Sequence, residues 1–408
     1  MMTSEQLLTE AKGYENDFVK NRRYLHAHAE TGFDLSETLA YVKGKLAAMG
    51  YEPRECGKAG LTVTAGGKNP GKVFLIRGDM DALPIPEEAD VEFPSENGKM
   101  HACGHDMHTA MLLGAARLLK DHEDEINGTV KLMFQPAEEI FEGAKDMIDA
   151  GVLNHPDVDA ALMIHVMAGL PFPAGTVVAC DGGVSAPAAD YFEIKVQGKG
   201  CHGSMPNAGV DPVTVAAHII TALQEIHARE LSLADEAVLT IGTVHAGLAA
   251  NVIPDTVEMS GTIRTYDEDI RTFIKTRMED IVNNIGAAFR ADAKVIHGKG
   301  CPVLENDAEL SACTVRYLQE ILGPQKAFSQ GQLTAMAGGK TPKTVGSEDF
   351  AYVSQKVPSI MLALAAGHPD KGYCFPQHHP KVRFDEEVLA PGSAVYAYTA
   401  MRWLEEHR

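Results

Sequence analysis

The sequence predicts an α/β protein with a second domain, of α+β class, inserted into the first. Helical and strand patterns alternate along the chain, and polar motifs repeatedly follow the predicted strands. The pattern changes near residue 187 and changes back near residue 297, which indicates the insertion. With 408 residues and 45% hydrophobic side chains, the chain is long enough to form two cores.

The first domain is expected to begin with helices and to continue with alternating strands and helices. Apolar residues at helical spacing predict the helices, and short apolar runs such as KVFLIRG predict buried strands. In chain order, we expect helices over about 4–26 and 36–49, a strand over 72–78, a helix over 108–121, a strand over 129–135, a helix from about 141 and a strand over 159–166. Asp79 and Asp81 follow the first strand, at the edge where active sites of open α/β sheets collect.

The inserted region begins with the strand pattern ADYFEIKVQGKG. After it we expect a helix over 210–229, strands over 237–246 and 255–265, a helix over 267–288 and a strand over 292–297. A βαββαβ order of this kind forms a compact antiparallel sheet with two helices. The sequence therefore predicts an inserted domain of residues 187–297 and a main domain made of 1–186 plus 298–408.

Composition excludes several classes of protein. The chain has 56 acidic and 36 basic residues and a formal charge of -20, which disfavours nucleic acid and anionic lipid as partners. We find no apolar run long enough for a membrane span, and the N-terminal segment is polar and helical rather than a secretion signal. The seven cysteines are scattered without a repeated spacing, which favours a reducing compartment. We therefore expect a cytoplasmic protein that does not contact membranes.

Residues 101–108 read HACGHDMH and lead directly into an apolar helical stretch. Cys103 offers a soft thiolate and His105 a neutral imidazole, and these ligands suit zinc, cobalt, nickel or manganese better than calcium or magnesium. Asp106 is expected to lie behind the ligands and to orient an imidazole. His101 and His108 are expected to be structural. The motif predicts part of a metal site.

The motif FQPAEEIFEGA places Glu138 and Glu139 side by side after a predicted strand. Neighbouring side chains of extended backbone point to opposite sides, so the two carboxylates need not share a role. One could bind metal while the other transfers protons. A solvated acidic pair at a helix N-terminus is the alternative.

Other candidate ligands are dispersed along the chain. His165 ends the apolar strand ALMIHV and is either a core residue or a ligand. His378 and His379 are adjacent in QHHPKVRFDEE, and either could bind metal.

The inserted region carries three polar candidates. His202 lies in the Gly-rich turn GKGCHGSMP, where it could polarise a carbonyl or stabilise an oxyanion. Asn251 and Arg264 could bind a substrate carboxylate, although a loop cap and a surface ion pair are the alternative roles.

Taken together, the motifs resemble the metal-dependent amidohydrolase family of aminoacylases, hippurate hydrolases, bacterial N-acetyldiaminopimelate deacetylases and plant indole-acetyl-amino-acid hydrolases. The resemblance covers nearly the whole chain. Its most specific part is CGHD with QPAEE about 30 residues later, supported by RGDMDALPI, GKGCHGSMP, NVIPD, GTIRT, GSEDF and QHHP.

The resemblance implies a catalytic domain with two divalent metal ions per subunit, zinc or manganese first and cobalt or nickel as alternatives. It implies that Glu138 acts as general base and acid and that Asp81 supports the ligands. The implied metal ligands are Cys103, His105, Glu139, His165 and His378.

The resemblance further implies that residues 187–297 form a lid through which the protein assembles into a homodimer or a higher homo-oligomer. In such a homodimer His202 of one subunit would reach the active site of the other, with Asn251 nearby. Three positions depart from the family pattern: Ala29 replaces a usual proline, Gln377 replaces a usual leucine, and Cys201 replaces a small residue.

The predicted reaction is hydrolysis of the amide bond of N-acyl amino acids, which yields a carboxylic acid and a free amino acid. Two alternatives are a dipeptidase or exopeptidase on the same scaffold, and a non-catalytic metal-binding protein with a closed four-ligand site. The presence of Glu138 beside Glu139 argues against the latter.

Overall fold

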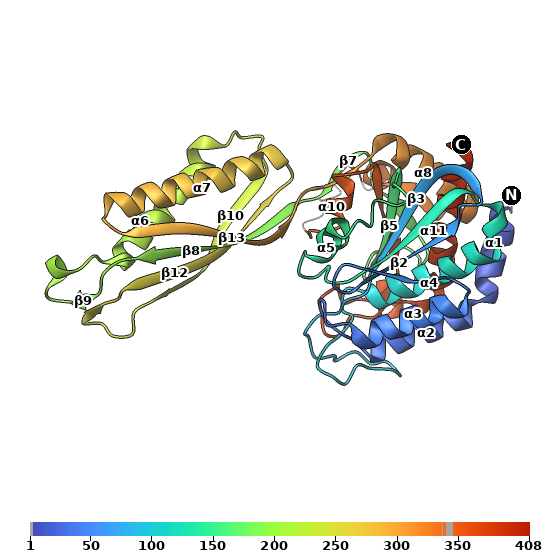
Figure 1. Ribbon diagram of the computed structural model, residues 1–408, viewed down its shortest axis with the longest axis horizontal. Helices are drawn as coiled ribbons and strands as arrows, with labels where there is room; N and C mark the ends of the chain where they lie inside the picture. The colour runs from blue at the N-terminus through green and yellow to red at the C-terminus, as the bar shows by residue number, and fades with distance from the viewer. Residues whose placement is uncertain (1–2, 337, 340–345) are drawn as a thin grey trace. The chain divides into compact units, whose positions relative to one another are not determined.

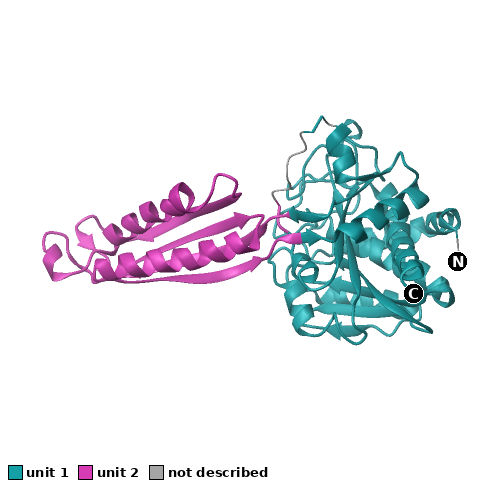
Figure 2. Cartoon of the chain, turned by 90° about the horizontal axis from the view of Figure 1, so that it is seen from above, with its two compact units in different colours: residues 1–185, 305–343, 348–408 teal, residues 186–304, 344–347 magenta. Residues whose placement is uncertain are grey.

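The protein, seen in a computed structural model that describes residues 3–336, 338–339 and 346–408, divides into two compact units (Figure 2). Unit 1 contains the chain up to Ser185, the stretch that begins at Glu305, and Glu348–Arg408, whereas unit 2 contains Ala186–Leu304. Each unit has its own hydrophobic core. Within the described ranges, no helix is long and apolar enough to cross a membrane.

Unit 1 is built on an eight-stranded mixed sheet (Figure 1). Its strands, in their order across the sheet, are β1 (Arg54–Cys56), β2 (Gly60–Gly66), β4 (Asn127–Gln135), β3 (Asn69–Asp79), β5 (Ala160–Met167), β16 (Ser359–Ala365), β6 (Val177–Ala179) and β15 (Ala327–Ser329). The four strands from β4 to β16 run parallel, whereas the β1–β2, β2–β4 and β6–β16 pairs are antiparallel.

Helices pack against this sheet, with α4 and α11 side by side against β3, β4 and β5. The helices of unit 1 are α1 (Ser4–Gly13), α2 (Glu15–Ala27), α3 (Ser36–Ala48), α4 (His105–Asp121), α5 (Gly143–Asp149), α8 (Ala308–Leu322), α9 (Gln330–Met336), α10 (Ala351–Ser354) and α11 (Leu389–Glu406). Because α4 packs against the sheet, against α11 and against α2, it is buried along most of its length. The polar groups in its first turn therefore need partners inside the protein.

The parallel strands bring several polar motifs to one edge of the sheet. Asp79 of β3 lies opposite Gln135 of β4, and Arg77 lies opposite Met163 of β5, two residues before His165. The strand ends thus lie at one level, as expected for parallel strands. The start of α4 is fixed at the same edge, because the Thr109 hydroxyl donates to the carbonyl of Asp79 at 2.7 Å.

Unit 2 is a four-stranded antiparallel sheet with two helices packed on one of its faces (Figure 1). The strands, in sheet order, are β10 (Ala237–Ala246), β12 (Thr256–Thr265), β8 (Ala188–Gln197) and β13 (Asp292–Cys301); the helices are α6 (Pro212–Glu225) and α7 (Glu268–Ala288). A short ribbon pairs β9 (Cys201–His202) with β11 (Val252–Ile253). The order of the main elements is βαββαβ, and the predicted fold class is confirmed.

Three predicted helices differ from the structure. The helix expected over 4–26 is two helices, because Tyr14 leaves the helical conformation and its hydroxyl donates to Asp121 near the end of α4. The helix expected over 108–121 begins earlier, at His105. The helix expected over 210–229 begins at Pro212, where Asp211 caps it, and ends in a π-helical turn from Ile226. These limits depend on tertiary contacts and caps rather than on periodicity.

Candidate metal centre

The turn before α4 brings Cys103 and His105 against the end of β5. Gly104 caps the helix with φ of 92°, a left-handed conformation that favours glycine. A Cβ at this position would lie 2.4 Å from Cγ2 of Val166. Only glycine therefore allows the thiol and the imidazole to approach the strand so closely.

The imidazoles of His105 and His165 are held in the same way. The Nδ1–H group of His105 donates to the carbonyl of Asp81 at 2.8 Å, and that of His165 donates to the carbonyl of Val166 at 2.7 Å. Each ring consequently presents Nε2 as its remaining nitrogen. Asp81 thus supports a predicted ligand through its backbone.

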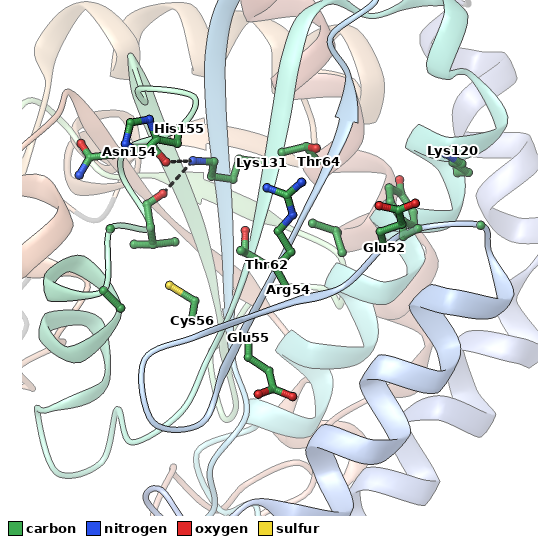
Figure 3. Close-up of a pocket in the computed structure, with 16 residues that line it drawn as sticks. Glu52, Arg54, Glu55, Cys56, Thr62, Thr64, Lys120, Lys131, Asn154 and His155 are labelled. Atoms are coloured by element: carbon green, nitrogen blue, oxygen red, sulfur yellow. Dashed lines mark hydrogen bonds between the residues drawn. The ribbon is translucent and has the colours of Figure 1, made fainter.

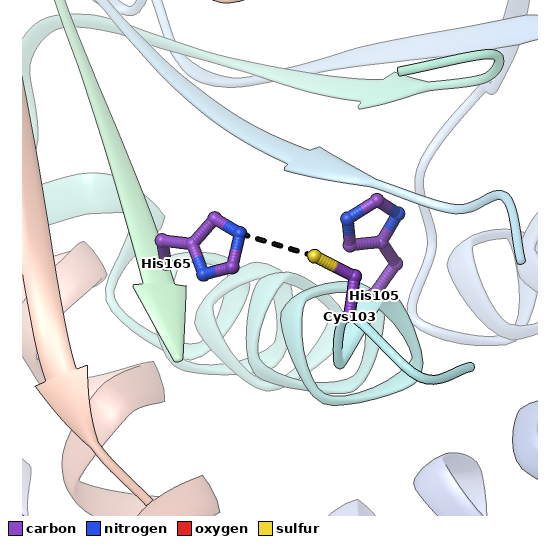
Figure 4. Close-up of side chains that lie close together, drawn as sticks. All are labelled: Cys103, His105 and His165. Atoms are coloured by element: carbon purple, nitrogen blue, oxygen red, sulfur yellow. Dashed lines mark hydrogen bonds between the residues drawn. The ribbon is translucent and has the colours of Figure 1, made fainter. Parts of the chain in front are cut away.

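The five predicted ligands lie in two overlapping groups. Cys103, His105 and His165 form the first group (Figure 4), in which Sγ of Cys103 is 3.5 Å from Nε2 of His165. Cys103, Glu139 and His378 form the second, in which Nε2 of His378 is 3.6 Å from Glu139. Within each group all ligand atoms lie within 4.8 Å of one another. Because Cys103 belongs to both groups, two cations could lie next to each other.

Two buried atoms of this cluster have no hydrogen-bond partner within the described part of the chain. They are Nε2 of His105 and Oε1 of Glu139, which are 3.9 Å apart. Leaving a buried polar atom unpaired costs about 1–3 kcal/mol, and a cation between these atoms would remove that cost. A thiol, imidazoles and a carboxylate are the ligands that zinc and similar metals prefer. The donor set therefore fits a divalent transition metal ion.

The protein alone shifts the pKa values of these ligands. Burial, followed by the charge of Glu139, raises the pKa of Cys103 to about 12. Burial raises the pKa of Glu139 to about 7 and lowers that of His165 to about 4. Burial also acts to lower the pKa of His105, but Asp79 and Cys103 outweigh it and raise that pKa well above its usual value.

Glu138 lies beside the five predicted ligands, and one of its carboxylate oxygens lies within 4.8 Å of ligand atoms of His105 and Glu139. Its carboxylate is buried and is 3.8 Å from Nε2 of His105, and its backbone N–H donates to Asp81 at 3.0 Å. Burial, followed by the charges of Glu348 and Glu139, raises its pKa well above that of an ordinary glutamate. A carboxylate with these properties can take up and return a proton.

A buried ionic network behind Glu138 was not predicted. Arg77 is fully buried and contacts Asp79 at 2.7 Å, Glu348 at 2.8 Å and Asp349 at 3.0 Å, and its Nε–H donates to Gln135. The carboxylate oxygens of Glu138, Glu348 and Asp349 lie within 4.8 Å of one another. An arginine inside the apolar run KVFLIRG was the available signal, because a buried charge needs a partner.

The other two histidines of HACGHDMH lie outside the two groups formed by the predicted ligands. His108 donates from Nδ1 to Asp79 at 2.6 Å and accepts the Val166 N–H at Nε2, so both nitrogens are used. His101 is buried, and burial lowers its pKa to about 3. Neither ring belongs to the groups formed by the five predicted ligands.

Asp106 differs from its expected role in one respect. Its carboxylate accepts hydrogen bonds from Arg22 at 2.8 Å and from Nδ1 of His26 at 2.9 Å. It therefore orients an imidazole, but this imidazole is not one of the predicted ligands. The sequence could not reveal this partner, because α2 reaches Asp106 only in the folded chain.

The structure distinguishes His378 from its neighbour. The ring of His379 stacks on Phe375 with centroids 4.4 Å apart, and its Nδ1 accepts the N–H of Lys381. Nε2 of His378 instead faces Glu139. The geometry thus favours His378 as the last ligand.

The three polar candidates of unit 2 do not lie together. His202 and Asn251 are neighbours, because the Gly203 N–H donates to the carbonyl of Asn251 beside the β9–β11 pair. Arg264 lies on β12, eight residues beyond Thr256, which at ~3.3 Å per residue places it at the other end of the sheet. Its guanidinium lies over the ring of Tyr191. One subunit therefore does not join all three into one substrate site.

A pocket elsewhere in unit 1 contains none of the predicted site residues (Figure 3). Arg54, Cys56 and Lys131 are among the side chains that line it. The ammonium of Lys131 donates to three backbone carbonyls of segment 152–156 and so has no free N–H. This pocket adds no ligand to the metal cluster.

A cluster of candidate metal ligands beside a buried carboxylate, at the edge of an α/β sheet, is typical of hydrolytic enzymes of the metallopeptidase class. The chain belongs to the peptidase family M20/M25/M40, whose model matches residues 75–402. The resemblance inferred from the motifs is thereby confirmed.

Individual relatives match over nearly the full length. A thermostable carboxypeptidase 2 of Saccharolobus solfataricus is 36% identical over 98% of both chains. An N-acetylcysteine deacetylase of Bacillus subtilis is 35% identical over 97% of this chain and 98% of its own. A solved Bacillus subtilis structure, described as a dinuclear metal-binding peptidase of the M20 family, is 32% identical over 97% of this chain and 99% of its own, with a TM-score of 0.77.

Proposed function

We propose that the protein hydrolyses the amide bond of N-acyl amino acids and releases a carboxylic acid and a free amino acid. The observation that carries this proposal is the position of the Glu138 carboxylate, 3.8 Å from Nε2 of His105 at the edge of the ligand cluster. The deacetylase among its relatives acts on a substrate of this class.

Two divalent metal ions would be held by Cys103, His105, Glu139, His165 and His378, and Asp81 would support His105 through its carbonyl. Zinc or manganese suits this set best, with cobalt or nickel as alternatives. When bound, the metals would act as Lewis acids that lower the pKa of water towards neutrality.

Glu138 would receive the proton of the attacking water and deliver it to the departing amine. Its raised pKa suits both steps, because a carboxyl group that titrates nearer neutrality can hold a proton and release it. Arg77 and its carboxylate partners would fix the surroundings of Glu138 without touching the substrate.

The protein would act as a homodimer through unit 2. Nδ1 of His202 accepts the hydroxyl of Ser204 at 2.7 Å, so that Nε2 remains to polarise the scissile carbonyl in the active site of the partner. Asn251 and Arg264 would bind the substrate carboxylate. Because they lie at opposite ends of the sheet of unit 2, a substrate site that uses both residues would take one from each subunit.

We also infer a cytoplasmic location. The seven cysteines, all within the described ranges, form no disulfide with one another, as is usual in a reducing compartment.

An exopeptidase that recognises a free N-terminal amine or a peptide C-terminus is the second candidate, because a carboxypeptidase is among the relatives. A panel of N-acyl amino acids and matched free dipeptides would be tested on chelator-stripped protein reloaded with single metals. Preference for the acylated substrates supports the proposal. Faster hydrolysis of free dipeptides would contradict it.

A further inference from the structure

A single backbone carbonyl joins two parts of the proposed metal site. The carbonyl of Val166 accepts the Nδ1–H of His165 at 2.7 Å and the Nε2–H of Gln377 at 2.9 Å. The N–H of Val166 donates to His108, whose other nitrogen donates to Asp79. Both the N–H and the carbonyl of Val166 are therefore hydrogen-bonded. The side chain of Gln377 thus donates to a carbonyl whose position is already fixed.

The residue that follows Gln377 is tied to a third part of the site. The N–H of His378 donates to the carbonyl of Ala102, next to Cys103, at 2.9 Å. His378 has φ of 66°, a conformation that costs free energy in any residue with a Cβ. Such a conformation persists only where surrounding contacts fix it, and these two hydrogen bonds are the contacts next to it.

We propose that Gln377 is a positioning residue, whose side-chain amide locks the segment carrying His378 onto the strand end carrying His165. The inference rests on the proposed metal site and names the group that fixes its geometry. A leucine, which the resemblance gives as the usual residue at this position, has no donor and could not form this hydrogen bond.

The hydrogen bond from Gln377 to the Val166 carbonyl has two consequences for the ligands. A second N–H on the Val166 carbonyl fixes that carbonyl and so keeps its bond to Nδ1 of His165, which leaves Nε2 for the metal. It also fixes the position of His378 relative to Glu139, 3.6 Å away. Groups of this kind behind a ligand typically affect metal affinity by about tenfold or more.

The test compares Gln377→Leu and Gln377→Glu with the wild type in the full-length protein. Leucine removes the donor, and glutamate retains the shape but places acceptors against a carbonyl. Gln325→Leu, at an exposed loop position, is the matched control. Zinc and cobalt affinity would be measured by competition with a chromophoric chelator. Hydrogen exchange of the 375–382 segment, measured by mass spectrometry, would be followed in metal-free protein.

We expect both Gln377 variants to bind metal about tenfold more weakly and their 375–382 segment to exchange several-fold faster, with an unchanged unfolding midpoint. The control should match the wild type. Wild-type affinity and exchange in both variants would overturn the inference. If one Gln377 variant unfolds globally, the metal affinity and the exchange rates of the other variant test the inference. If the wild type takes up no metal, the proposed function fails, whereas the exchange rates of metal-free protein still test the lock.

Discussion

At the scale of single residues, Glu138 is the side chain on which the proposed chemistry depends. Glutamine at this position has the same size but cannot take up a proton. We expect Glu138→Gln to lower kcat by about 10³-fold or more while both metals stay bound. Steady-state kinetics and elemental analysis of the same preparation would check this.

Cys103→Ala is the matched comparison for this variant, because it removes a group that lies in both candidate metal groups. It should lose bound metal together with activity. Substantial turnover by metal-loaded Glu138→Gln would refute the role of Glu138, and full metal content in Cys103→Ala would remove Cys103 from the ligand set.

The shifted pKa values predict that metal binding depends on pH. The thiol of Cys103, with a pKa raised to about 12 by burial and Glu139, must lose its proton when metal binds. Glu139, with a pKa raised to about 7 by burial, carries a further proton below pH 7. Because protons compete with metal, we expect affinity to fall by at least about tenfold for each pH unit between 8 and 6.

Calorimetry in buffers of different ionisation enthalpy would measure the protons released. The release should exceed one proton per protein and should grow as the pH falls through 7. A pH-independent affinity would show that metal binding displaces no proton from Cys103 or Glu139.

At the scale of elements, the turn into α4 is the feature that assembles the cluster. Gly104→Ala would place a Cβ 2.4 Å from Cγ2 of Val166 and impose a left-handed conformation on alanine. We expect a loss of stability of about 1–3 kcal/mol and weaker metal binding. Denaturant unfolding and metal titration would measure these changes.

Gly13→Ala is a suitable control, because a Cβ at Gly13 meets no atom within 4 Å. Its stability should stay within about 0.5 kcal/mol of the wild type. Equal stability of the two variants would mean that the turn can relax around the added methyl group.

At the scale of the whole molecule, the proposed dimer predicts that two inactive variants can restore activity when they assemble with each other. If Glu138 of one subunit works with His202 of the other, Glu138→Gln and His202→Ala are each inactive alone. Mixing them gives heterodimers with one intact site, so an equal mixture should recover about a quarter of wild-type activity. Activity of denatured and co-refolded mixtures would be compared with that of each variant.

No recovery in the mixture, with heterodimers present by native mass spectrometry, would place both residues in sites of one subunit. Full activity of His202→Ala alone would remove the histidine from the reaction. Either result leaves the role of Glu138 untouched.

The sequence by itself determined the fold class, the family and the chemical character of the site. These properties are local along the chain: strand periodicity placed Asp79, Glu138 and His165 after or at the ends of neighbouring strands, and parallel strands must bring their ends to one edge. The types of side chain in HACGHDMH and QPAEE limited the metals and the reaction.

Only the tertiary structure decided which distant groups meet. It separated His378 from His379, gave Asp106 a partner in His26, and paired Arg77 with Glu348. It also revealed that Gln377 bonds to the carbonyl next to His165. The physical reason is that such contacts depend on the packing of segments far apart in the chain, and a pattern of neighbouring residues carries no information on that packing.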